Sequence, residues 1–116
     1  MGGSFATSDE HSRLELKPLR VAIRKEDVYA EARNLAADLP GWRIVSADDE
    51  RQVLVCERRG GVLSGTSTVT ITFEGPEGIP STTVNARSVS TGGLPGLARD
   101  RAAVLEFMRP FHRRVG

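Results

Sequence analysis

Apolar and polar residues alternate along several stretches of the chain, and a period of two residues is typical of β-strands. The pattern predicts a first strand over residues 14–23, with a slip in phase at Pro18. Because proline lacks an N–H, this strand is expected at a sheet edge or to carry a bulge. Further strands are predicted from Trp42 and over residues 52–57, 68–73 and 81–89. The apolar run at residues 53–56 is unbroken, which indicates a strand covered on both faces.

Two other stretches repeat their apolar residues every three to four positions, which is the period of an amphipathic helix. The first helix is predicted over residues 24–39, where Pro40-Gly41 ends it. The second begins at about Leu97 and continues its apolar face to Phe111. Pro110 cannot donate an N–H to the preceding turn, so we expect this helix to end near Arg109 or to kink there.

The predicted order of elements is β-α-β-β-β-β-α. Short connections between the last four strands favour an antiparallel meander. Two amphipathic helices would cover one face of this sheet, which gives an α+β two-layer sandwich. Residues 14–116 form the predicted single domain, and the small, polar residues 1–13 are predicted to be a disordered tail. Many threonines point to the other face of the sheet, which is therefore either solvated or folded around a groove.

Charge and composition exclude several classes of protein. The chain of 116 residues has a net charge of +1, with four phenylalanines, one tyrosine and one tryptophan. Near neutrality and few aromatic rings argue against nucleic acid as a partner. A single cysteine excludes an internal disulfide. No apolar run approaches the length of about 20 residues that a membrane helix needs, and the N-terminus lacks a signal-peptide pattern, so we expect a cytoplasmic protein.

The residues that usually carry catalysis are scarce or badly placed. The only histidines, His11 and His112, lie near the two ends, and Cys56 lies in the most apolar strand, where a thiol behaves as a core residue. We therefore expect no catalytic site, no metal and no cofactor. Asp48-Asp49-Glu50 is predicted to be a solvated turn, with a weak calcium site as the alternative.

Two basic stretches have structural explanations. Arg58-Arg59-Gly60-Gly61 resembles an RNA-binding repeat but occurs once, so a hairpin loop is the preferred interpretation. The basic residues at the end of the last helix complement its dipole without any ligand, and a nucleic-acid contact is the alternative. These residues are Arg109, His112, Arg113 and Arg114.

The most specific residue order lies where the last strand turns into the last helix, at residues 87–101. Backbone N–H groups at a helix N-terminus can bind an anion, and glycines allow it to approach closely. The candidate anion-binding residues are Arg87, Ser88, Ser90, Thr91, Gly92, Gly93, Arg99 and Arg101. The structural alternative is a tight strand-to-helix connection with Arg87 on a solvated face.

Over residues 14–112 the chain resembles a bacterial and plant family catalogued as domain of unknown function 1499. The resemblance rests on Arg87-Ser88-Val89-Ser90 before a glycine turn, on Leu16-Lys17-Pro18-Leu19, and on residues 39–45. The family pattern has a second arginine where this chain has Thr91, and Asp-x-Gly where it has Leu94-Pro95-Gly96. Because the charged positions are lost together, any chemistry that they perform in the family is expected to be lost here. The resemblance implies a fold and no activity.

Three functions remain open. The first is a small non-catalytic binding or interaction module that holds a small anion or a protein partner at residues 87–101. The second is an enzyme or lipid-type carrier with a cavity between the sheet and the helices. The third is a structural protein that forms homodimers through the edge strand at residues 14–23.

Overall fold

The computed structural model describes residues 4–59, 66–91 and 97–115, and two helices pack on one sheet in it. The strands are β1 (Ser4–Ala6), β2 (Leu19–Val21), β3 (Trp42–Asp48), β4 (Val53–Arg59), β5 (Thr66–Glu74) and β6 (Thr82–Thr91). The helices are a 3-10 turn, η1 (Leu14–Leu16), and the α-helices α1 (Lys25–Asp38) and α2 (Leu97–Val115).

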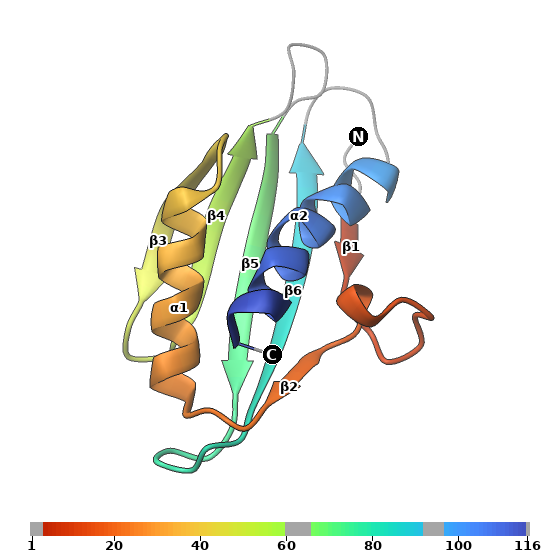
Figure 1. The fold of residues 1–116 in the computed structure, drawn as a ribbon. Helices are drawn as coiled ribbons and strands as arrows, with labels where there is room; N and C mark the ends of the chain where they lie inside the picture. Colours follow the sequence, from red (N-terminus) through yellow and green to blue (C-terminus); the bar gives the residue numbers. More distant parts are fainter. Residues whose placement is uncertain (1–3, 60–65, 92–96, 116) are drawn as a thin grey trace.

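The sheet has the order β1-β6-β5-β4-β3, and β2 pairs with a second part of β6. All of its pairings are antiparallel, and β3 to β6 form the expected meander. Figure 1 shows α1 and α2 on the same side of the sheet. The predicted α+β fold with helices on one face is therefore confirmed. We call the opposite side, which neither helix covers, the open face.

The core lies between the sheet and the helices. Along β5, Val69, Ile71 and Phe73 are buried while the threonines between them are half-buried, as the alternation predicts. Phe107 and Phe111 of α2 are fully buried above the sheet. Their rings pack together with their centroids 5.1 Å apart. Large side chains thus fill the layer beneath α2.

The N-terminal segment is ordered where residues 1–13 were predicted to be a disordered tail. Ser4–Ala6 pairs with β6, and the buried Thr7 donates its backbone N–H to the carbonyl oxygen of Ala86 at 2.9 Å. The tail interpretation does not hold for residues 4–7, because their hydrogen-bond partners lie about 80 residues further along the chain, beyond what local composition can indicate.

The strand predicted over residues 14–23 is shorter than expected. Leu14–Leu16 forms η1, which buries Leu16 and leaves Leu14 at 65% exposure. Leu14 and Leu16 alternate with polar residues as in a strand, but a single 3-10 turn produces the same short pattern. Only Leu19–Val21 is extended, and it pairs with β6 alone, so its predicted place at the edge is correct.

Two further predictions are corrected. In the apolar run of β4, Leu54 and Cys56 face the helices while Val53 and Val55 are half-buried on the open face, so this run is covered on one face and not on both. Of the two alternatives predicted at Pro110, an end near Arg109 is wrong, because α2 continues through Pro110 to Val115. The fully buried Phe111 provides packing that offsets the hydrogen bond lost at the proline.

Candidate functional site

Strand β6 divides the candidate site between two faces. Side chains alternate along a strand, so Ser88 and Ser90 point to the helix side, where they are fully buried. Arg87 points to the open face and is exposed. The structure therefore does not bring Arg87 together with the two serines, although the three are neighbours in sequence.

On the helix side the two serines bind a carboxylate of the protein itself. Ser88 Oγ donates to Asp100 Oδ1 at 2.7 Å, and Ser90 Oγ donates to Asp100 Oδ2 at 2.8 Å. Asp100 lies in α2 and is fully buried. Hydrogen bonds of this kind to a carboxylate are among the stronger ones in proteins. An external anion at these hydroxyls would have to displace Asp100, so they act as an attachment point for α2.

Sequence reasoning missed Asp100, although a signal was present. Asp100 precedes Val104, Phe107 and Phe111 by four, seven and eleven positions, which places a carboxylate in the apolar face of the helix. A charged residue in a buried stripe needs polar partners, and the serines of β6 were available.

The other candidate residues are spread around the same corner. Arg99 is half-buried and Arg101 exposed in the first turns of α2, and the backbone of Thr91 ends β6. Gly92 and Gly93 lie outside the described residues, so the predicted glycine turn is neither supported nor contradicted.

On the open face, Arg87 borders a shallow hollow of about 440 Å³. Ser46, Val55, Thr70, Arg87 and Ala6 stand side by side in one row across the strands. The hollow is lined by Ala6, Thr7, Thr70, Thr72, Glu74, Asn85, Ala86 and Arg87. Threonine hydroxyls and a guanidinium group thus share one concave surface.

The polar groups of this hollow differ in what they already bind. Arg87 forms no ion pair or side-chain hydrogen bond with any residue that the structure describes. Thr7 Oγ1 donates to Asn85 Oδ1 at 2.8 Å, which fixes the amide of Asn85. Thr70 of β5 is opposite Arg87, and Glu74, which is opposite Thr83, lies four residues further along β5. The separation of Thr70 and Glu74 along the strand is about 13 Å. The hollow therefore has a free cation at one end and a carboxylate at the other.

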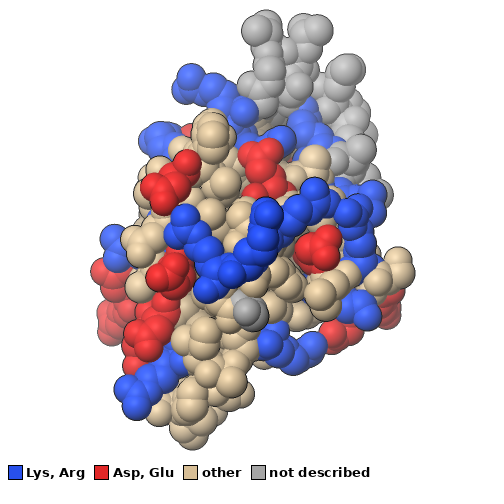
Figure 2. Space-filling model, viewed as in Figure 1, with Lys and Arg blue, Asp and Glu red and all other residues tan. Residues whose placement is uncertain are grey.

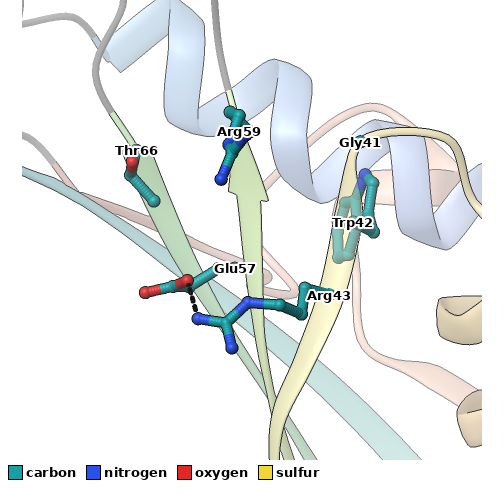
Figure 3. A pocket seen from close by; sticks show the side chains of 6 residues that line it. All are labelled: Gly41, Trp42, Arg43, Glu57, Arg59 and Thr66. Atoms are coloured by element: carbon teal, nitrogen blue, oxygen red, sulfur yellow. Dashed lines mark hydrogen bonds and ion pairs between the residues drawn. The ribbon is translucent and has the colours of Figure 1, made fainter.

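A second hollow, of about 290 Å³, lies where β4 ends and β3 and β5 begin, and Figure 3 shows its lining. Arg43 reaches across from β3 to Glu57 of β4, and their ion pair is 2.5 Å long. Arg59 stands beside them without a side-chain hydrogen bond or ion pair among the described residues. Arg43 and Glu57 neutralise each other, so Arg59 is the cation that this hollow offers. The hollow at Arg87 places more hydroxyl groups around its cation, from Thr7, Thr70 and Thr72.

The neighbouring Arg58 has a structural role on the opposite face. Its guanidinium donates to both carboxylate oxygens of Glu106 at 3.2 and 3.1 Å, and Trp42 Nε1 donates to the same carboxylate at 2.5 Å. Burial opposes ionisation of Glu106, but these donors outweigh it and hold the pKa of Glu106 below its usual value. The network fastens α2 to β3 and β4, so Arg58 and Arg59 lie on two different faces.

The acidic turn is also structural. Asp48 Oδ1 accepts hydrogen bonds from the backbone N–H groups of Glu50 and Arg51, which is how Asp stabilises a turn. Asp49 accepts a hydrogen bond from Tyr29 at 2.7 Å. Burial, together with this bond, raises the pKa of Tyr29 to about 12. Within the described ranges, no group of three or more His, Cys, Asp or Glu residues is arranged to hold a metal ion.

Cys56 is a core residue, as predicted. It is fully buried in β4, and burial raises the pKa of its thiol to about 11, so the thiol stays protonated at neutral pH. Among the helices that the structure describes, none is long and apolar enough to cross a membrane.

Comparison with known proteins adds no assignment. No protein-family model matches the chain, and no curated protein matches it. The resemblance to the family of domain of unknown function 1499 therefore stays a prediction.

Proposed function

We propose that the protein is a small, non-catalytic binding module, and that its binding surface is the open face of the sheet around Arg87. The observation that carries this proposal is the guanidinium of Arg87, which has no side-chain partner among the residues that the structure describes and lies in a concave surface bordered by Thr70, Thr72 and Asn85. The site lies beside the strand-to-helix corner rather than within it, because Ser88 and Ser90 already bind Asp100.

The chemistry of the surface favours a small anion or an anionic group of a protein partner. Arginine binds carboxylates and phosphates through paired N–H groups, and threonine hydroxyls can add further hydrogen bonds. The described aromatic rings lie in or against the core, so stacking of a base or a sugar ring receives no support.

A carrier or an enzyme with an internal cavity is less well supported. Such a cavity would have to lie between the sheet and the helices, and Phe107, Met108 and Phe111 fill the layer beneath α2. We therefore place this alternative below the binding module.

The test is the melting temperature of the protein during titration with sulfate, compared with NaCl of equal ionic strength. A specific site raises the stability by about 1.4 kcal/mol when the free anion is at ten times its Kd, which is several degrees for a domain of this size. We expect this gain in the wild type and its loss in Arg87→Gln.

Two control variants separate the open face from other sites. Arg109→Gln removes an exposed arginine of α2 and is expected to keep the response to sulfate. Ser88→Ala is expected to keep the response as well, because Ser88 donates to Asp100. A response that depends on Ser88 and not on Arg87 would place the anion at the corner and contradict the proposed surface.

A further inference from the structure

The layer of two helices is divided by charge. Figure 2 shows basic side chains crossing the side of α2 and acidic side chains gathered over α1. Arg109 and Arg113 are exposed on α2, and Glu26 and Asp27 are exposed in the first turn of α1. None of these four side chains forms an ion pair with another residue in the described part of the chain.

The two helices run in opposite directions on the sheet (Figure 1). A groove between them is lined by Asp27 and Glu31 of α1 and by Arg114 and Val115 of α2, so the acidic end of α1 lies beside the basic end of α2. Within one chain, Arg114 already pairs with Glu31 at 3.7 Å and with Asp38 at 3.3 Å. The charges that stay unpaired are complementary. Asp27 lines this groove, Arg113 adjoins Arg114 at the same end of α2, and Arg109 lies about one turn further along that helix.

We propose that two copies of this chain associate through their helix layers, about a two-fold axis that runs parallel to the helices. This operation places α1 of each copy on α2 of its partner, and the same surface is used by both copies. Because Asp27 and the end of α2 line the same groove, this operation brings Asp27 opposite Arg113 of the partner subunit, with Arg109 about one turn further along that helix. The two-fold axis repeats this contact once more.

The outer surfaces of the helices suit close packing. Ala30 and Ala37 of α1 and Ala102 of α2 are exposed, and Leu105 is half-buried beside Ala102. Ala30 and Ala37 are seven positions apart, so they lie on one ridge of α1. Small side chains on such ridges let two helices approach each other to about 8–10 Å.

The sheet edges are less suited to self-association than the helix layer. At one edge, β1 and β2 have three residues each, and at the other β3 has an irregular register between Ile44 and Ser46. Short edge strands and bulges are features that prevent pairing between sheets. The homodimer expected through residues 14–23 is therefore the weaker of the two arrangements.

The first experiment is sedimentation equilibrium of the wild type at two salt concentrations. Exposed ion pairs are individually weak and are screened by salt, so we expect dimers at about 50 mM NaCl and at least a tenfold higher Kd at about 500 mM NaCl. A wild type that stays monomeric at low salt, at a protein concentration of about 1 mM, would overturn the proposal.

The decisive experiment uses two charge-reversed variants. Arg109→Glu/Arg113→Glu makes both helix surfaces acidic, and Glu26→Arg/Asp27→Arg makes both basic, so each variant alone is expected to be monomeric. Mixed in equal amounts, they are expected to form a heterodimer, because every contact between the helices then joins opposite charges. Failure of the mixture to associate, while each variant keeps the circular dichroism of the wild type, would overturn the proposal.

Two further variants distinguish a contact between helices from an effect of net charge. Arg51→Glu/Arg59→Glu causes the same change in net charge away from the helices and is expected to dimerise like the wild type; loss of its dimer would show that net charge alone decides association. Ala102→Trp leaves every charge in place but blocks close packing, so we expect it to be monomeric. A fully dimeric Ala102→Trp would contradict the helix-layer interface even if the charge-reversed variants fail to fold.

Discussion

At the scale of single residues, the polar groups of β6 have separate tasks. Ser88 and Ser90 hold the buried carboxylate of Asp100, and Arg87 is exposed on the open face. The alternation along the strand could be predicted, and it places Asn85 and Arg87 on the same side. That Asp100 binds the two serines could not be predicted, because this contact depends on how α2 packs on β6.

Removing the carboxylate of Asp100 should therefore destabilise the protein strongly. Asp100→Ala leaves two buried hydroxyls without their acceptor and opens a small cavity, so we expect a loss of about 3 kcal/mol in the free energy of unfolding. Urea denaturation followed by circular dichroism measures this value.

The triple variant Ser88→Ala/Ser90→Ala/Asp100→Val tests the cause of this loss. Replacing all partners of a buried polar network by apolar groups removes the unsatisfied hydroxyls, so this variant should be more stable than Asp100→Ala. A triple variant that loses as much as the sum of the separate changes would show that the three side chains do not act as one network.

At the scale of elements, periodicity identified α1 and the threonine-bearing β5 well. Val28, Ala32, Leu35 and Ala36 of α1 are buried as their spacing predicts. The shortest elements, β1 and η1, were missed because three residues carry too little pattern. Their conformation comes from hydrogen bonds to distant parts of the chain.

Strand β1 is therefore expected to contribute to stability. Deleting residues 1–7 removes its pairing with β6 and the hydrogen bonds of Thr7 to Asn85 and Ala86. At about 1 kcal/mol for each hydrogen bond, we expect the free energy of unfolding to fall by at least about 2 kcal/mol in urea denaturation. Deletion of residues 1–3 is the control and should change little; equal stability of the two deletions would show that β1 contributes nothing.

At the scale of the whole molecule, Cys56 lies in the layer that both helices cover and can report on complete unfolding. Its thiol is fully buried and its pKa is raised to about 11, so reaction with a thiol reagent requires that the structure opens. We expect the labelling rate at pH 8 to rise with urea with the same slope as the equilibrium unfolding. A rate that does not change at low urea would instead indicate local opening of β4.

The amino-acid sequence by itself determined the elements whose side-chain period is long enough to read, the α+β class, and the core positions of α1, β5 and Cys56. Only the tertiary structure decided which face of β4 is covered, where residues 4–7 bind, and that Asp100 occupies the serines of the corner. The physical reason is that periodicity reports how one segment divides its own faces. Burial and pairing of polar groups depend on contacts between segments far apart in the chain, and those contacts bury Ser88 and Ser90 while they leave Arg87 exposed.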